Sequence, residues 1–244
     1  MKKFFLLIIL LLFLFTTANS QLIDEPYDFP IKPGTPEWEQ FSTRDEMLKA
    51  VQIPDDILKK LNTKALVETC LTYPLFDDIL IYSSHRRAIE KIINDFNGFG
   101  ELLLKQDVFT YLFEKYESLN PNAIGEDWSL LMKGRFALKF INMETLFFQD
   151  EIVKNMSYEE KMLLLKDSYS KYKKMLKDEE IYGIFSYESI LYLMIKLLVA
   201  INEPNMLATI NSSKEIGFFL EHMRISNYDT IRDIEILVNK VIQN

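Results

Sequence analysis

The sequence is poor in the residues that build covalent cross-links, zinc sites and phosphate-binding loops. Its 244 residues include one cysteine, two histidines and seven glycines. One cysteine cannot form an intrachain disulfide, and with two histidines it is too little for a Cys/His zinc site. Neither a G-x-G-x-x-G motif nor a G-x-x-x-x-G-K-[ST] motif is present, so no nucleotide-binding loop is predicted. We therefore expect neither a metal ion nor a cofactor.

Basic residues are in the minority. Lys and Arg total 28 against 36 Asp and Glu, which gives a formal net charge of −8. Nucleic-acid binders normally carry a basic face for phosphates, so nucleic acid is not an expected partner. Hydrophobic residues make up 48% of the chain, which is too many for a disordered protein. The composition indicates a folded protein with a substantial core.

The first 20 residues have the pattern of a secretory signal peptide. Lys2 and Lys3 precede twelve consecutive apolar residues, Phe4–Phe15, and small residues lead up to a cleavage point between Ser20 and Gln21. Twelve residues span about 18 Å as a helix, against about 30 Å for a bilayer core, so a membrane anchor is the weaker interpretation. The sequence therefore predicts export to the periplasm, the cell surface or the exterior.

Removal of residues 1–20 would leave 224 residues with a formal charge of −10, because Lys2 and Lys3 are lost. The densest remaining apolar stretch, Ile190–Ile201, contains Lys196 and is predicted to be a buried core helix. No transmembrane span is therefore expected in the mature chain. The lone Cys70 has no cationic neighbour in the sequence and is predicted to be a buried, unreactive thiol.

Residues 21–41 are predicted to be an extended N-terminal arm. Four prolines recur there at spacings of three or four: Pro26, Pro30, Pro33 and Pro36. Each proline favours extended backbone in the residue before it. We expect Tyr27, Phe29 and Trp38 to hold the arm against the rest of the chain. Docking of the arm onto a neighbouring protein of an envelope complex stays open as an alternative.

Residues 42–244 are predicted to form a single all-helical domain. Thr43–Glu46 and Ser157–Glu160 fit capping boxes, and serines are placed to cap other helices, among them Ser84 and Ser186. Asn97-Gly98 is expected to end the helix that Ser84 begins. No segment shows sustained strand alternation. We expect an all-α fold of stacked antiparallel helical hairpins, like an irregular α-solenoid; a compact orthogonal helical bundle is the alternative.

Several segments in the first half of the chain resemble a known family. They are Pro33–Trp38, Ser42–Met47, Gln52–Pro54, Leu66–Leu71 with Tyr73–Leu75, and Phe96–Phe99 with Glu101–Leu103. In this order they resemble a family of exported, functionally uncharacterised helical proteins of Gram-negative bacteria. The resemblance covers about residues 33–120 and implies a bacterial, exported helical module. It implies no activity and no catalytic residue.

Residues typical of catalysis are present, but not in a catalytic pattern. The two histidines, His85 and His222, have no metal-ligand spacing and are interpreted as surface or interfacial side chains. Acidic pairs are numerous, and most fall at predicted helix starts, where the helix dipole favours them. No catalytic residue is therefore identified from the sequence.

A tyrosine- and lysine-rich region is the best candidate for an interaction surface. We take Tyr169, Tyr172, Lys173 and Tyr182 as its members, because tyrosine is favoured at recognition surfaces and aromatic rings also suit sugars. Helix-core packing is the simpler explanation for the same residues. The preferred hypothesis is a non-catalytic structural or interaction module of the bacterial envelope, with a protein or glycan partner. The alternative is a carboxylate-dependent hydrolase acting on a polymer or peptide.

Overall fold

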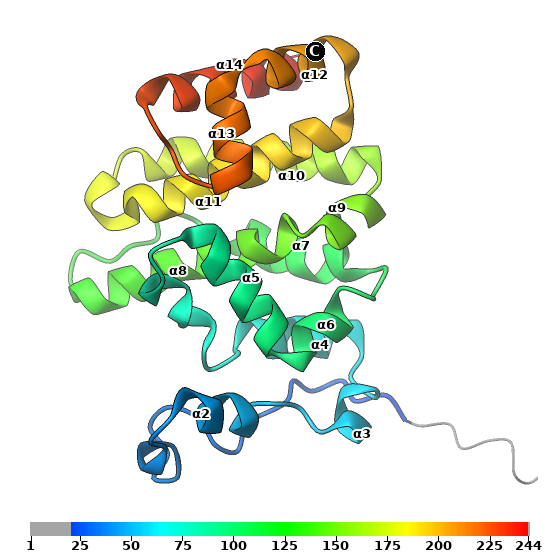
Figure 1. The fold of residues 1–244 in the computed structure, drawn as a ribbon, viewed down its shortest axis with the longest axis vertical. Helices are drawn as coiled ribbons and strands as arrows, with labels where there is room; N and C mark the ends of the chain where they lie inside the picture. Colours follow the sequence, from blue (N-terminus) through cyan, green and yellow to red (C-terminus); the bar gives the residue numbers. More distant parts are fainter. Residues whose placement is uncertain (1–20, 244) are drawn as a thin grey trace, which may run out of the picture.

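The computed structural model describes residues 21–243, and in that range the chain is all-helical, as predicted. Its helices are stacked in chain order along the long axis of the molecule (Figure 1). The arm and the first short helices lie at one end, and the C-terminal helices lie at the other. The predicted signal peptide, residues 1–20 with Ser20 at the cleavage point, lies outside the described residues.

The first half of the described chain contains mostly short helices. They are η1 (Trp38–Gln40), α2 (Arg44–Ala50), α3 (Asp55–Leu58), α4 (Thr63–Leu71), η2 (Phe76–Ile81), α5 (His85–Asp95), α6 (Asn97–Leu102) and α7 (Val108–Ser118). The second half contains the long ones: α8 (Leu130–Phe147), α9 (Asp150–Asn155), α10 (Tyr158–Met175), α11 (Glu179–Ile201), α12 (Pro204–Ser212), α13 (Lys214–His222) and α14 (Tyr228–Gln243).

The N-terminal arm is packed against the helices that follow it. The backbone of Ile23 exchanges hydrogen bonds with Lys60 and Asn62, at 2.7 and 3.0 Å, and the N–H of Tyr27 donates to Thr69 Oγ1 at 2.9 Å. Phe29 is buried. These contacts give the extended backbone the hydrogen-bond partners that it lacks internally.

The lower layers share a core of aromatic rings, which we call the aromatic core. Its members are Phe29, Tyr73, Phe76, Phe96 and Phe99. Tyr73 and Phe96 are stacked with their centroids 4.2 Å apart, and the other contacts are tilted or edge-on. Such offset and edge-to-face pairs stabilise beyond the burial of area alone. The aromatic core ties the arm to the turn after α4, to η2 and to the start of α6.

Capping patterns in the sequence correctly predict where three of the helices begin. Both expected capping boxes are present, with Thr43 and Glu46 at α2 and Ser157 and Glu160 at α10. Ser84 also caps its helix, because its hydroxyl accepts from the Arg87 N–H at 3.4 Å. A cap involves residues only three positions apart, so it can be predicted without knowledge of the tertiary fold.

The helix that Ser84 begins ends just before Asn97-Gly98, as expected, but these two residues do not cap it. Helix α5 stops at Asp95, and Asn97 and Gly98 begin α6 instead. The Asn97 amide brackets the backbone of Ile53, accepting from its N–H at 3.0 Å and donating to its carbonyl at 2.7 Å. A Cβ at position 98 would lie 2.3 Å from the Phe96 ring, so glycine is required there for close packing.

Helix α11 lies at the centre of the second half. It packs chiefly against α8 and α10, with further contacts to α14. Among residues 21–243 it is the one helix whose length and composition would allow it to cross a membrane, and 61% of its most apolar stretch is buried in the fold. Ser186 does not cap it as expected: the helix already begins at Glu179, and Gly183, with φ 56° and ψ −175°, breaks its regularity.

Candidate functional site

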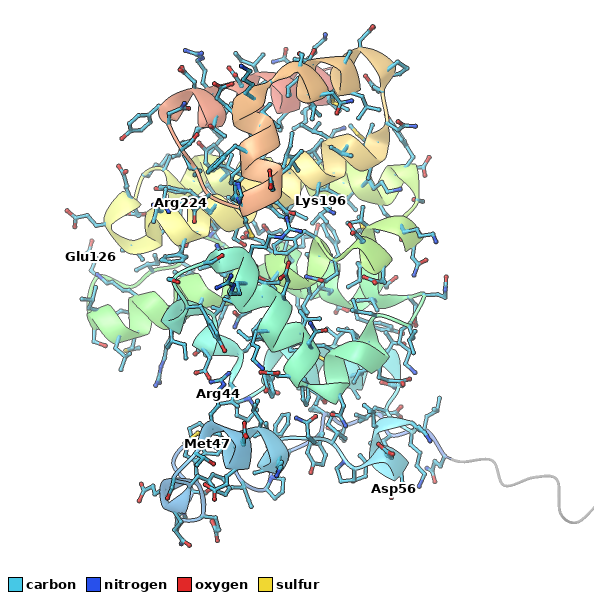
Figure 2. All side chains as sticks on the ribbon, in the orientation of Figure 1. Arg44, Met47, Asp56, Glu126, Lys196 and Arg224 are labelled. Atoms are coloured by element: carbon cyan, nitrogen blue, oxygen red, sulfur yellow. The ribbon has the colours of Figure 1, made fainter. Side chains whose placement is uncertain are left out.

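Two neighbouring cavities lie between α5 of the lower half and α11 and α13 of the upper half. The larger has a volume of about 740 Å³ and the smaller about 190 Å³. They share Arg86, Glu90 and Met223 in their walls, and we call them together the interlayer cleft. Figure 2 shows Arg224 and Lys196, which line it, where the two halves meet. The larger cavity is within the usual size range of small-ligand sites.

The first turn of α5 forms one wall of the larger cavity. Ser84 caps the helix, and His85, Arg86 and Arg87 follow in the first turn, all lining the cavity. The helix dipole disfavours cations at this end. The dipole therefore does not explain two arginines here, and of the two only Arg86 forms an i,i+4 pair, with Glu90.

His85 is buried in the cleft wall, with 5% of its surface exposed. Its ring meets that of Phe185 edge-on at 5.3 Å, and Nδ1 lies 3.8 Å from Glu188 Oε2. Neither ring nitrogen has a hydrogen-bond partner among the described residues. The other carboxylate oxygen of Glu188 accepts from the Ile225 N–H at 3.0 Å. Glu188 thus links α11 to the segment between α13 and α14, beside the imidazole from α5.

The second histidine lines the same cavity. His222 lies in the last turn of α13, with its ring centroid 4.3 Å from that of Phe218 and Nε2 3.8 Å from Glu221 Oε2. Met223 then adopts a left-handed conformation, with φ 50°, and ends the helix. This turn brings Arg224 into the cavity wall. The structure therefore unites the two histidines, which lie 137 positions apart in the sequence.

Only some of the charged side chains that line the larger cavity form ion pairs with one another. Glu90 pairs with Arg86 at 3.0 Å, while Glu188 and Glu221 each lie 3.8 Å from an imidazole, that of His85 and of His222 respectively. Arg87 and Arg224 form no ion pair with any of residues 21–243. The cleft thus presents two unpaired guanidinium groups in a protein of net charge −8.

The larger cavity also has an apolar wall. Ile184, Phe185 and Phe218 line it, with 51%, 36% and 40% of their surfaces exposed. Large apolar side chains gathered at one concave place favour the binding of an apolar group. The cavity therefore combines cationic and apolar surface.

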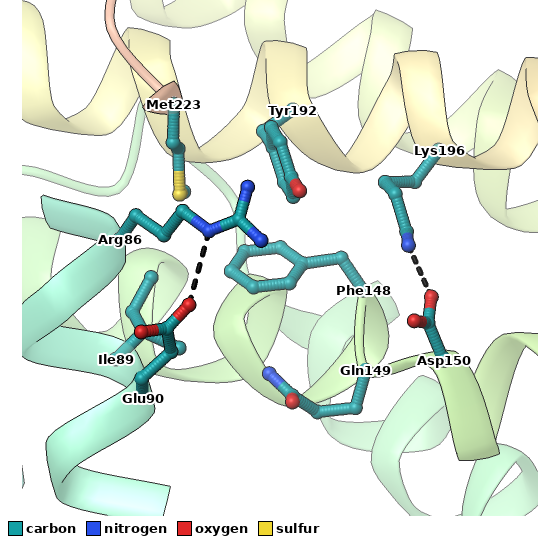
Figure 3. A pocket seen from close by; sticks show the side chains of 9 residues that line it. All are labelled: Arg86, Ile89, Glu90, Phe148, Gln149, Asp150, Tyr192, Lys196 and Met223. Atoms are coloured by element: carbon teal, nitrogen blue, oxygen red, sulfur yellow. Dashed lines mark hydrogen bonds and ion pairs between the residues drawn. The ribbon is translucent and has the colours of Figure 1, made fainter. Parts of the chain in front are cut away.

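Figure 3 shows the smaller cavity, where both halves of the molecule contribute side chains. Arg86 enters from α5 and donates to the carbonyls of Leu220 and Glu221, at 3.3 and 2.5 Å, near the end of α13. The rings of Phe148 and Tyr192 meet edge-on at 5.0 Å beside it. An ion pair between Lys196 and Asp150 lies across the cavity. The Arg86 contacts join α5 to the end of α13, and the other two pairs join α11 to residues 148–150.

A second group of ionisable side chains is buried away from the cleft, between α7, α8, α10 and α11. Glu144 is fully buried there, and Tyr116 donates to its Oε1 at 2.9 Å. Burial raises the pKa of Glu144 to about 7, against the opposing effects of the Ser189 and Tyr116 hydroxyls and the positive charge of Lys171. Lys171 is itself bound to Asp167 at 2.7 and 2.9 Å. We call these residues the polar core; Glu144 lines neither cavity.

The acidic pairs singled out in the sequence lie mostly where expected. The pairs that occupy the first turn of a helix are Asp45-Glu46, Asp55-Asp56, Asp77-Asp78, Asp150-Glu151, Glu159-Glu160 and Glu179-Glu180. Their positions agree with a favourable interaction with the helix dipole. The carboxylates of the larger cavity, Glu90, Glu188 and Glu221, come from outside these pairs.

The tyrosine-rich region is largely internal. Tyr172 and Tyr182 have only 2% and 3% of their surfaces exposed, and the hydroxyl of Tyr182 donates to the Pro121 carbonyl at 2.6 Å. Tyr169 is half-buried, and Lys173 is exposed and pairs with Glu235 at 3.3 Å. Of the four candidates, only Tyr169 and Lys173 are accessible to a partner. Tyr172 of α10 and Tyr182 of α11 lie on the helix faces that pack into the core.

Sequence reasoning missed Glu188 and Arg224 as members of a site. Glu188 lies 103 positions after His85, and no local pattern connects them. The isolated carboxylates in apolar helices, Glu144 and Glu188, were the available signal, because a buried charge requires a partner. The expectation for Cys70 is met: the thiol is fully buried, and burial raises its pKa.

Comparisons of the chain with protein-family models, with curated proteins and with solved structures found no match.

Proposed function

We propose that this protein is a non-catalytic interaction module of the bacterial envelope whose interlayer cleft binds a segment of a protein partner. The observation that carries the proposal is the pairing of two unpaired arginines with an apolar wall in one cavity of about 740 Å³. Such a surface suits a short segment with both acidic and apolar side chains. Binding of one extended segment needs only a few such anchors.

A protein partner fits the apolar wall better than a glycan. Sugars stack on open aromatic faces, whereas Phe185 meets His85 edge-on and Phe218 packs against His222. Ile184 adds a branched aliphatic side chain, 51% exposed, that offers no stacking face. An apolar side chain of a peptide can fill such a surface without ring stacking.

Ionisable groups of the cleft already bind the backbone at and after the end of α13. Glu188 accepts the Ile225 N–H, and Arg86 binds Glu90 together with the carbonyls at the end of α13. Groups held in this way are fixed in position, as a binding surface requires.

A selection from a phage-displayed random peptide library on the purified protein tests the proposal. We expect peptides that combine Asp or Glu with Phe, Leu or Ile to be enriched. The double variant Ile184→Glu/Phe218→Glu should weaken their binding at least ten-fold, because it places like charge on the apolar wall.

The matched control is Leu130→Glu/Leu131→Glu, which changes two exposed apolar residues of α8 outside the cleft. This variant should bind as the unaltered protein does. No enrichment, or equal loss in both double variants, would contradict the proposal. Binding of acidic oligosaccharides instead of peptides would assign a glycan partner, and cleavage of a bound peptide would assign a hydrolase.

A further inference from the structure

We propose that the first turn of α5 is an oxyanion-binding site inside the interlayer cleft. This inference rests on the proposed function, since it names the chemical group of the partner that binds there. The group is a carboxylate or a phosphate, and both share the same recognition by N–H donors and guanidinium forks.

The helix itself supplies donors. The first N–H groups of a helix have no acceptor within it, and α5 is eleven residues long. Ser84 Oγ takes the N–H of Arg87, which leaves the N–H groups of His85 and Arg86 for a ligand. Together with the dipole, free N–H groups at this end favour a bound anion.

The His85 imidazole is independent evidence for a ligand at this place. Its side chain is 3% exposed and lines the cavity, yet neither ring nitrogen has a hydrogen-bond partner among the described residues. An unpartnered polar group is destabilising when buried. The ring lies beside Glu188, with Nδ1 at 3.8 Å. An oxyanion would give a ring N–H of His85 the acceptor that no described residue supplies.

Two arginines complete the site from both sides of the cleft. Arg87 comes from α5 and Arg224 from the segment after α13, and both line the larger cavity without an ion pair. The carboxylates nearest an anion here would be Glu90, which pairs with Arg86 at 3.0 Å, and Glu188 and Glu221, which lie 3.8 Å from the His85 and His222 imidazoles. A bound oxyanion would be a common ion-pair partner for Arg87 and Arg224.

The experiment measures the thermal unfolding midpoint of the purified protein with inorganic phosphate, with glutarate and with potassium chloride at equal ionic strength. We expect phosphate or glutarate to raise the midpoint saturably, and chloride to leave it unchanged. Stabilisation by glutarate alone would assign a carboxylate, and stabilisation by phosphate alone would assign a phosphate group.

Arg87→Gln and Arg224→Gln should each weaken the apparent affinity at least ten-fold. Arg232→Gln, an exposed arginine of α14 outside the cleft, is the matched control and should leave it unchanged. Circular dichroism of each variant verifies that it is folded. No stabilisation by either anion, or equal stabilisation of all variants, would overturn the site.

The two proposals can fail separately. Anion binding that needs Arg87 and Arg224, without any selected peptide, would overturn the protein partner and leave the oxyanion site. Peptide binding that is lost in the Ile184→Glu/Phe218→Glu variant but unaffected by Arg87→Gln and Arg224→Gln would overturn the oxyanion site alone.

Discussion

The aromatic core and the polar core are built from different chemistry. The aromatic core joins the arm to the turn after α4, to η2 and to the start of α6 through rings whose centroids lie 4.2 to 6.4 Å apart. The polar core joins α7, α8, α10 and α11 around Glu144, with Tyr116 and Lys171 beside it. One core is specified by ring shape, and the other by hydrogen bonds and charge. Only the second contains a carboxylate whose raised pKa makes stability change with pH near neutrality.

The polar core is organised by charges held at short range. Lys171, 3% exposed, is bound to Asp167, and its Nζ lies 4.8 Å from the centroid of the Tyr116 ring. Burial also raises the pKa of the Tyr116 hydroxyl, which keeps it a donor to Glu144. Buried polar groups cost stability unless paired, so such a core specifies one arrangement of the helices at the expense of stability.

The largest effect is expected from opening the aromatic core. Phe96→Ala removes a ring that contacts Phe29, Tyr73 and Phe99. A cavity of this kind costs about 3–5 kcal/mol of unfolding free energy, measurable by urea unfolding. Tyr228→Ala, at a position 87% exposed, is the control and should cost little. A loss below about 1 kcal/mol for Phe96→Ala would show that the arm does not depend on this core.

The next largest effect is expected in the polar core and depends on pH. The pKa of Glu144 is about 7 in the folded state, above the ordinary value of 4.5, so the folded state holds this proton more tightly than the unfolded chain. The resulting stability is fully present below pH 4.5, falls as the pH rises to about 7, and is absent above it. The loss is on the order of 3 kcal/mol.

Glu144→Gln removes this titration while leaving an acceptor for Tyr116. Urea unfolding from pH 4.5 to 8 should therefore show a flatter dependence than in the unaltered protein, with the variant more stable at pH 8. Glu117→Gln, at an exposed position of α7, is the control and should keep the original dependence. If both variants and the unaltered protein follow one curve, Glu144 does not titrate as its burial indicates.

The smallest effect is expected at the helix caps, and there the two halves should agree. Thr43→Ala in α2 and Ser157→Ala in α10 each remove one side of a capping box. Each should lower the unfolding free energy by about 1 kcal/mol. Capping is local, so the kind of core beneath the helix should not matter. Losses that differ by more than about 1 kcal/mol would show that one cap is coupled to its core.

The same contrast explains what could be predicted from the sequence. The helical class and the caps at Thr43, Ser84 and Ser157 follow from residues close together in the chain. The role of Gly98 depends on the ring of Phe96, and the break in α11 depends on the positive φ of Gly183. Helix-end patterns alone could not determine either.

The cleft could not be predicted, because its parts are brought together by the stacking of layers. His85 appeared to be an ordinary histidine in a basic stretch, and Glu188 an ordinary carboxylate in an apolar helix. Only packing brings them to 3.8 Å. The predicted tyrosine surface rested on residue type alone. Tyr172 and Tyr182 are of a residue type that is common at recognition surfaces, but they occupy core positions and are buried.

The contact of Arg86 with the end of α13 has a consequence for the order of folding. The guanidinium binds carbonyls 134 and 135 positions later in the chain. Closing so long a loop costs conformational entropy, and contacts of large sequence separation form late. The cleft is therefore expected to form only when the last layer docks. Local opening of α12–α14 would abolish the cleft while the earlier helices stay folded. Binding of a ligand in the cleft would therefore show that the C-terminal helices have docked.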